Sequence, residues 1–419
     1  MKKPLLSLLV AGLALAQHPA GAWGFFGHRI INQVAVYNLP TPMQAFYYRH
    51  LSELVRLSTA PDERRNDDPS EGPKHFIDMD YYDDLNPFGK LPRKFDDATA
   101  KFTADTVRKY GTVPWVVLET KNNLVEAFRQ RDTVAIVKYS AELGHYVGDA
   151  FVPLHTTMNY DGQLTDQKGL HSLWESQLPE KFIIDYKLDS APASFIKDPL
   201  AAIWLVVQSS YGFLDETFNR ATTIEKAMPP ALRYTFSHRY GKTQRRYSDA
   251  FAAEYEKAVG GMVAFRLKGA PTMVASFWLT AWEEAGKPDL GSMMLPPKQT
   301  KEEKTRINTE LEAFKKGTLA QDQLLLAQAK VKKAEAADEI KAAQDMPPPP
   351  PEPEAAPVAP VAPVAPVAPA TEPAPTPAPT PAPEPAPTPE KIKVKTKAAN
   401  GGTKKQKIKK ADDWGGSGW

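Results

Sequence analysis

The sequence predicts an all-α fold, with a multi-helix domain over residues 23–290. Long segments place apolar residues at helical spacing, and few segments show the alternation typical of a strand. Short connections that contain Gly or Pro separate these segments. The expected helical regions are residues 30–39, 43–57, 98–145, 200–218 and 250–286. A domain of this length can bury one sizeable hydrophobic core.

The first 22 residues have the pattern of a secretory signal peptide. Two lysines precede a short apolar run over residues 5–16, and Ala20-Gly21-Ala22 supplies small residues for cleavage. An uncleaved membrane anchor is the alternative, but the run is too short for a comfortable span. We therefore expect export to the periplasm or the exterior, with a mature chain that begins at Trp23. The sequence has no cysteine, so stability must come from packing or from metal.

The C-terminal part of the chain changes in composition three times. Residues 298–346 are rich in Lys, Glu, Ala and Gln, and we expect a charged helix that is exposed or depends on a partner. Residues 347–390 form a Pro/Ala-rich linker, which cannot pack a core and should be a disordered, stiff spacer. Residues 391–419 form a basic tail with nine lysines up to Lys410. A solubilising end is the favoured interpretation of this tail, and attraction to an anionic envelope surface is the alternative.

Pairs of possible metal ligands recur in the middle of the domain. His145 and Asp149 are four residues apart, so a helix would place both side chains on one face. Pro153 should end that helix and turn His155 back toward the same place. His171 and Glu175 repeat the four-residue spacing. One such pair is weak evidence, but two pairs with a histidine between them predict a metal site.

Further candidate ligands lie upstream of these pairs. They are Asp62, His75 in a His-Phe-Ile-Asp motif, and His28 close to the expected mature terminus at Trp23. Imidazole and carboxylate are the ligands that zinc takes when thiolate is absent. A zinc peptidase is disfavoured because no His-Glu-x-x-His occurs, and a di-iron bundle because the sequence has a single Glu-x-x-His, at Glu142 and His145, where the bundle uses two.

In this set and order, the motifs resemble those of the superfamily of zinc-dependent phospholipases C and single-strand-specific nucleases. The resemblance covers about residues 23–290 and implies an α-helical domain with a trinuclear zinc site. It implies one zinc ion on Asp62, His75, His145 and Asp149, and a second on His155, His171 and Glu175. The third would take His28, Asp149, and the amino nitrogen and carbonyl oxygen of Trp23.

The resemblance also implies hydrolysis of a phosphodiester, with Asp62 and Asp149 in catalytic roles. Three zinc ions, three carboxylates and one hydroxide would leave the site with a charge of about +2, which suits an anionic substrate. The expected reaction is in-line attack of hydroxide on phosphorus. A non-catalytic envelope protein stabilised by zinc is the alternative from another class, although structural zinc sites usually contain thiolates.

Two substrates fit this chemistry, and residues point to each. Glu175 in place of Asp, the lack of cysteine and the short segment between His155 and His171 resemble the phospholipase branch, which we favour here. The compact spacing of Trp23 and His28 resembles the nucleases, which include 3′-nucleotidases. Arg65, Phe76 and Asp78 also match nuclease positions that stack and hydrogen-bond a base in single-stranded nucleic acid. The plain alternatives are a surface charge for Arg65 and core packing for Phe76.

Overall fold

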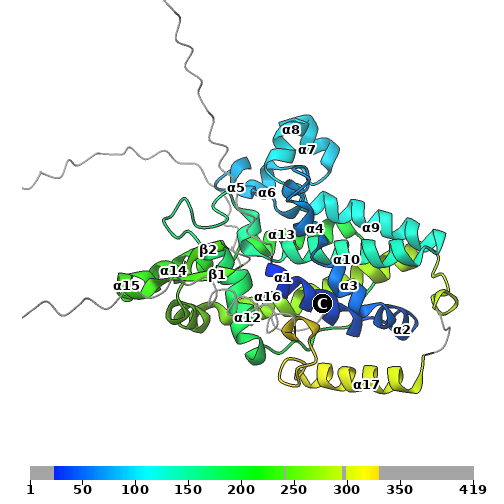
Figure 1. Cartoon of the computed structure of the whole chain (residues 1–419). Coiled ribbons are helices and arrows are strands. Elements are labelled where there is room, and N and C mark those ends of the chain that lie inside the picture. Colours follow the sequence, from blue (N-terminus) through cyan, green and yellow to red (C-terminus); the bar gives the residue numbers. More distant parts are fainter. Residues whose placement is uncertain (1–22, 240–241, 295–298, 330–419) are drawn as a thin grey trace, which may run out of the picture. The chain divides into compact units, whose positions relative to one another are not determined.

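The computed structural model describes residues 23–239, 242–294 and 299–329. Within these residues the regular secondary structure is almost entirely helical, which confirms the predicted all-α class (Figure 1). The expected signal peptide, Pro/Ala-rich linker and basic tail lie outside the described residues. Among the described helices, none combines the length and the apolar character that crossing a membrane requires.

The N-terminal half contains ten α-helices and two short 3-10 turns. They are α1 (Gly24–Tyr37), α2 (Thr41–Arg49), α3 (Leu51–Leu57), α4 (Ala60–Arg64), η1 (Gly72–His75), α5 (Met79–Tyr82), α6 (Pro87–Lys90), α7 (Phe95–Phe102), α8 (Ala104–Lys109), α9 (Val113–Gln130), α10 (Thr133–Ala150) and η2 (Pro153–Thr156). The long helical region expected over residues 98–145 is thus divided among four helices. Thr103 and Arg131, which both have positive φ, lie at two of the breaks, and Gly111 with φ of 95° lies at the third.

The remaining described residues form the second half of the domain. Its elements are α11 (Leu170–Ser172), the π-helical turn η3 (Leu173–Gln177), α12 (Leu178–Phe182), η4 (Ile183–Asp185), α13 (Pro199–Tyr211), α14 (Leu214–Ala227), α15 (Pro230–Arg233), β1 (Tyr234–Arg239), β2 (Lys242–Tyr247), α16 (Asp249–Glu284), η5 (Gly291–Met293) and α17 (Lys301–Lys316). The strands β1 and β2 pair in an antiparallel hairpin, which the sequence analysis did not expect.

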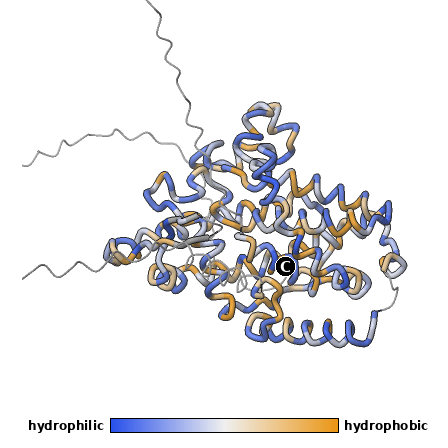
Figure 2. Tube along the Cα trace, in the orientation of Figure 1, coloured by the Kyte–Doolittle hydropathy of each residue, from blue (hydrophilic) through white to orange (hydrophobic). Residues whose placement is uncertain are grey.

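The core lies where α1, α9, α10 and α16 pack together, and their apolar residues face inward (Figures 1 and 2). Two glycines of α10 let α1 approach closely. A Cβ atom at Gly144 would lie 2.3 Å from the Asn32 side chain, and one at Gly148 would lie 3.2 Å from Ile31. This close approach brings the start of α1, which carries His28, beside the metal-ligand face of α10.

Helix α17 packs against the domain, contrary to the exposed or partner-dependent helix expected for this region. Most of its surface is hydrophilic (Figure 2), but Ile307 and Phe314 are buried. Tyr37 of α1 donates a hydrogen bond of 2.7 Å to the buried Glu310 of α17. The segment that follows is fixed as well, because Gln33 of α1 bonds to the backbone on both sides of Leu325. The expectation of an exposed helix failed because a narrow apolar stripe is enough to dock a charged helix.

Candidate metal centre

Helix α10 supplies the central pair of candidate ligands. His145 and Asp149 lie one turn apart and are fully buried, as their spacing predicted. The Nδ1 atom of His145 donates to the Ser58 carbonyl oxygen at 2.8 Å, which leaves Nε2 as the lone-pair nitrogen. That Nε2 lies 3.3 Å from Asp149 Oδ2. Pro153 begins the turn η2 directly after α10, so His155 returns toward the same site as predicted.

A first cluster forms around these two residues. The Nδ1 atom of His75 lies 3.0 Å from both His145 Nε2 and Asp149 Oδ2. Asp62, at the start of α4, places Oδ1 3.7 Å from the same His75 nitrogen. Helix α4, turn η1 and helix α10 therefore bring together Asp62, His75, His145 and Asp149, the four residues proposed for one zinc ion.

A second cluster joins His155 to the segment after Gly169. His155 Nδ1 donates to the His75 carbonyl oxygen at 2.6 Å, and its Nε2 faces His171 Nε2 at 3.0 Å. Glu175 Oε2 lies 2.8 Å from that His171 nitrogen. Because the backbone between the two residues passes from α11 into a π-helical turn, their spacing differs from that of a regular α-helix. The long Glu175 side chain still reaches the histidines.

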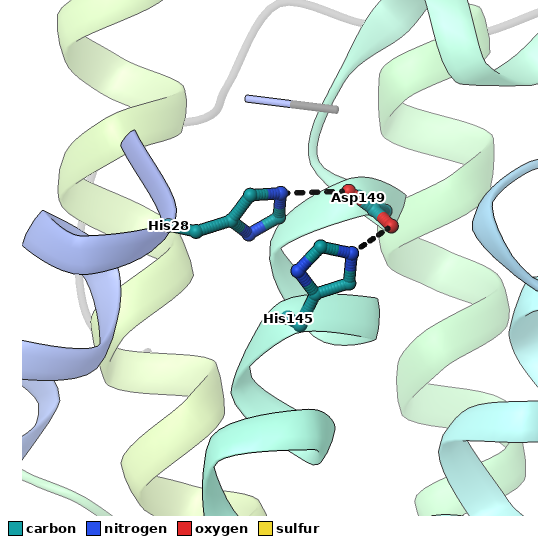
Figure 3. Close-up of side chains that lie close together, drawn as sticks. All are labelled: His28, His145 and Asp149. Carbon is teal, nitrogen blue, oxygen red and sulfur yellow. Dashed lines mark ion pairs between the residues drawn. The ribbon is translucent and has the colours of Figure 1, made fainter. Parts of the chain in front are cut away.

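A third cluster contains His28, His145 and Asp149, whose possible ligand atoms all lie within 4.8 Å of one another. His28 Nε2 faces Asp149 Oδ1 at 3.3 Å, so the two oxygens of Asp149 point to different clusters (Figure 3). Trp23 also reaches the centre, where its backbone nitrogen donates to Glu175 Oε2 at 2.8 Å. Its indole is fully buried and donates to the Gly148 carbonyl oxygen.

The distances and the unpaired atoms both fit metal ions. Tetrahedral zinc with ligand distances of about 2.0–2.2 Å separates its ligand atoms by about 3.3–3.6 Å. The ion pairs within the clusters measure 2.8 to 3.9 Å, and all the candidate ligand atoms of a cluster lie within 4.8 Å of one another. Among the described residues, Asp62 Oδ2, Asp149 Oδ1 and His28 Nε2 are buried without a hydrogen-bond partner. Buried polar atoms are rarely unpaired, so a cation at this place is the simplest account.

Burial and close charges perturb the ionisation of the site. Burial raises the pKa of Asp62, and it raises that of Glu175 to about 7. Burial acts the same way on Asp149, but His145 and His28 outweigh it and hold the Asp149 pKa well below its usual range. Burial also lowers the pKa of His171 to about 4, which favours the neutral imidazole that binds metal.

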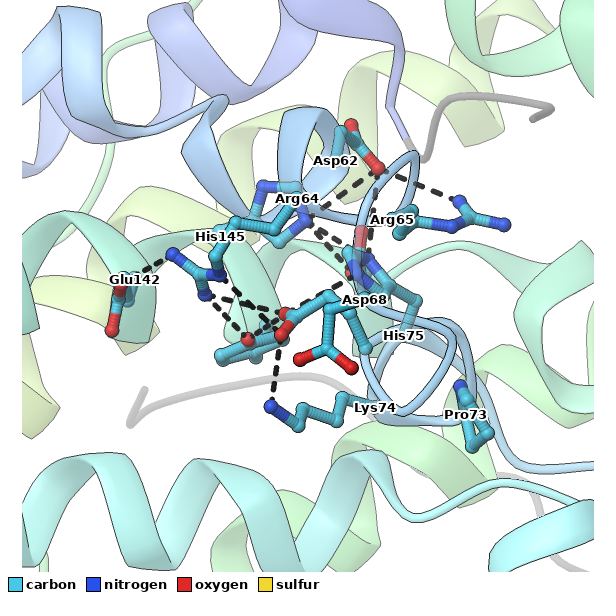
Figure 4. Close-up of polar contacts among 12 residues, drawn as sticks. Asp62, Arg64, Arg65, Asp68, Pro73, Lys74, His75, Glu142 and His145 are labelled. Carbon is cyan, nitrogen blue, oxygen red and sulfur yellow. Dashed lines mark hydrogen bonds and ion pairs between the residues drawn. The ribbon is translucent and has the colours of Figure 1, made fainter.

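A polar network contacts the Nε2 side of the His75 ring and orients it (Figure 4). His75 Nε2 faces the buried carboxylate of Glu71 at 3.7 Å. Tyr146 donates a hydrogen bond to Glu71, and Lys74 pairs with it at 2.8 Å. Arg64 bridges Glu71 to Glu142 on α10. Burial opposes ionisation of Glu71, but His75 and Lys74 outweigh it and hold its pKa well below the usual range. This network was not predicted from the sequence, although Glu71 precedes His75 by four residues and Tyr146 follows His145 directly.

Of the three predicted substrate-binding residues, Arg65 contacts the first cluster, and Phe76 and Asp78 follow His75 closely in the chain. Arg65 Nη1 lies 3.5 Å from Asp62 Oδ1, so its guanidinium borders the metal ligands (Figure 4). Phe76 is partly buried, and its carbonyl oxygen anchors the start of α9 through Val113. Burial, with a contribution from Asp80, raises the pKa of Asp78 to about 7. Asp78 is therefore a carboxyl group that can exchange its proton near neutral pH.

Together, the helical fold and the clustered His and carboxylate side chains define a class, the zinc-dependent phosphodiester hydrolases. A family model described as S1/P1 Nuclease matches residues 23–277, more than half of the 419-residue chain. The chain belongs to the S1/P1 nuclease family, within the superfamily that the sequence motifs indicated. Among individual curated proteins, none matches closely enough to add to this assignment.

Proposed function

We propose that the protein is a three-zinc nuclease that hydrolyses phosphodiesters of single-stranded nucleic acid. The observation that carries the proposal is the family match over the whole set of clustered ligands, from Trp23 to Glu175. The match begins at Trp23, which supports a mature chain that starts there after export. The finer substrate assignment rests on the residues beside the first cluster.

Nine residues would hold the three ions in this proposal. Asp62, His75, His145 and Asp149 would hold the first, and His155, His171 and Glu175 the second. His28, the second oxygen of Asp149 and the main-chain atoms of Trp23 would hold the third. Bound zinc supplies positive charge and activates water near neutral pH.

Three side chains have further roles in this proposal. Asp149 would contribute to two of the ion sites, because its Oδ1 faces His28 and its Oδ2 faces His145. Asp62 is buried next to the first cluster with Oδ2 unpaired among the described residues, so it is placed to orient the attacking water and to accept a proton. The guanidinium of Arg65 lies at the edge of the ligand set, where it can pair with a phosphate oxygen.

The residues beside His75 favour nucleic acid over phospholipid. Phe76 offers a ring for stacking, and Asp78 offers a carboxyl group for the hydrogen-bonding edge of a base. The local structure explains why Glu rather than Asp is present at position 175, the feature that suggested the phospholipase branch. The π-helical turn separates Glu175 from His171, and the longer side chain also accepts a hydrogen bond from Trp23. Phospholipid hydrolysis is therefore the second candidate, which the lack of cysteine and the short segment between His155 and His171 still favour.

One experiment compares the two substrates directly. Protein that begins at Trp23 is incubated with a single-stranded DNA oligonucleotide and with phosphatidylcholine vesicles, with and without chelator. We expect chelator-sensitive hydrolysis of the DNA, restored by zinc, and elemental analysis near three zinc ions per chain. An Asp78→Asn variant should lose activity on the oligonucleotide, and Asp97→Asn, an exposed position on α7, is its control. Hydrolysis of phosphatidylcholine without hydrolysis of DNA would overturn the proposal.

A further inference from the structure

The hairpin region carries an unusual concentration of positive charge. Residues 226–248 contain six lysines and arginines and no acidic residue, in a chain whose formal net charge is only +2. Four of the cations lie on the paired strands, namely Arg239, Lys242, Arg245 and Arg246. Four aromatic residues are interleaved with them, namely Tyr234, Phe236, Tyr240 and Tyr247. Cations mixed with aromatic rings are the composition of surfaces that bind single-stranded nucleic acid.

The hairpin presents a ring and a guanidinium outward from one face. Phe236 pairs with Arg245 in the register, and Tyr234 pairs with Tyr247, so these side chains share a face. The Arg245 guanidinium carbon lies 4.2 Å from the centroid of the Tyr234 ring. Phe236 is 72% exposed although it is a large apolar residue. A phenyl ring left in water on a strand is suited to stack against a base.

The base of the hairpin packs against the segment that carries two candidate metal ligands. The Tyr247 ring lies 3.8 Å from where a Cβ atom of Gly169 would be, and Gln177 donates to the Tyr247 carbonyl oxygen at 3.1 Å. Gly169 and Gln177 bracket the segment that carries His171 and Glu175. Strands of six residues extend about 20 Å. The hairpin therefore reaches outward from the segment that holds two candidate ligands.

The neighbouring acidic groups lie at this anchored end. Asp249 pairs with Arg246 at 2.8 Å and with Lys181 at 2.9 Å. Glu225 accepts a hydrogen bond from the Tyr247 hydroxyl. These carboxylates offset charge where β2 joins α16, whereas the exposed Arg245 pairs in register with Phe236, and the backbone pair Arg239 and Lys242 is next to the turn.

We propose that the β1–β2 hairpin binds single-stranded nucleic acid outside the metal centre, with its cations on phosphates and Phe236 against a base. This inference rests on the proposed function, because it makes the hairpin an extension of the same substrate path. A substrate of one or two nucleotides occupies the metal centre alone, whereas a longer strand also contacts the hairpin. The hairpin thus makes the protein prefer long single strands over short ones.

The test compares substrate lengths in the full chain that begins at Trp23. A triple variant, Arg239→Gln with Lys242→Gln and Arg245→Gln, and a separate Phe236→Ala are assayed on a dinucleotide and on a 20-nucleotide strand. The matched control is Arg220→Gln, an exposed arginine of α14 that pairs with Glu216. The basic tail is present in every protein, so its contribution cancels. Thermal melting checks that each variant is folded.

We expect kcat/KM of the triple variant to fall about tenfold on the 20-nucleotide strand and to stay unchanged on the dinucleotide. Three lost phosphate contacts should also reduce the slope of log affinity against log salt by about two. Phe236→Ala should lose several-fold on the long strand only. Equal kcat/KM on the long strand in wild type and folded variants would overturn the inference. An equal loss on both substrates would do the same, because the hairpin would then act through the metal centre.

Binding of a labelled phosphorothioate strand, followed by anisotropy, separates this inference from the proposed function. Wild-type protein that binds the strand through the hairpin but hydrolyses no DNA would refute the nuclease assignment and leave the hairpin as a binding surface. Wild-type protein that hydrolyses DNA, with variants that bind the strand as tightly as wild type, would refute the hairpin surface alone.

Discussion

Replacing Phe314 by Ala tests whether α17 belongs to the folded domain. The Phe314 ring is 8% exposed and lies 5.7 Å, centroid to centroid, from the Tyr37 ring of α1. Truncating a buried Phe to Ala costs about 3–5 kcal/mol of unfolding free energy. Because part of the ring edge remains exposed, we expect a loss of about 3 kcal/mol. In a domain of this size, that loss lowers Tm by roughly 6–12 °C.

Circular dichroism during thermal and urea unfolding measures the effect. The matched control is Lys315→Ala on the exposed face of α17, where the lysine pairs only with the exposed Glu312 among the described residues. An exposed pair of this kind contributes little, so the control should stay within about 0.5 kcal/mol of wild type. Deletion of everything after residue 297 should destabilise more than Phe314→Ala, whereas deletion after residue 346 should leave Tm unchanged.

If the Phe314→Ala and Lys315→Ala variants have the same Tm and urea midpoint as wild type, packing of α17 against α1 does not stabilise the domain. The region over residues 298–346 would then be the exposed helix that its composition suggests. Deletion after residue 297 would in that case leave both stability and turnover intact.

Four further outcomes are expected. Excess chelator should lower Tm by more than about 10 °C, because separate helices meet at the metal centre and no disulfide compensates for the loss of metal. An unchanged melting curve would contradict this expectation. One extra Gly before Trp23 should reduce zinc content and turnover but leave the fold, because an amide nitrogen is a poor ligand; equal zinc and turnover would remove Trp23 from the ligand set. Glu71→Gln should weaken zinc affinity about 10–100-fold by releasing His75, measured by chelator competition, and unaltered affinity would argue against the network. Burial raises the pKa of Asp78 to about 7, above its unfolded value of 3.8, so the folded state binds this proton more tightly than the unfolded state does. The free energy of unfolding should therefore fall as pH rises from about 4 to 7. Asp78→Asn should remove that decline, which amounts to about 2.7 kcal/mol between pH 5 and pH 8 in urea unfolding, and an identical decline in the variant would refute the assignment.

The candidate ligands could be predicted because their spacing reflects local backbone geometry. His145 and Asp149 share a face of one helix, and Pro153 ends that helix before His155, so the sequence determines these relations directly. The all-α class follows from the same periodicity over longer segments. Family resemblance then supplied the grouping of ligands, which spacing alone leaves open.

Relations between distant segments could not be predicted in this way. Arg64, Glu71 and Tyr146 form one network across three elements, and no local pattern distinguishes them from surface polar residues. The hairpin was missed because β2, Lys-Thr-Gln-Arg-Arg-Tyr, is rich in charged and polar residues that are uncommon in strands. The docking of α17 depends on matching apolar stripes on two helices, and the sequence of one helix does not reveal the other.

The glycine contact between α1 and α10 limits which parts of the protein can change. A methyl group at Gly148 would press on Ile31 and on the His28 imidazole, and one at Gly144 would displace Asn32. Either change would move His28 relative to Asp149, whereas metal coordination tolerates shifts of only about 0.2 Å. We therefore expect laboratory evolution toward new substrates to succeed in the hairpin and the loops, and to fail at this helix crossing.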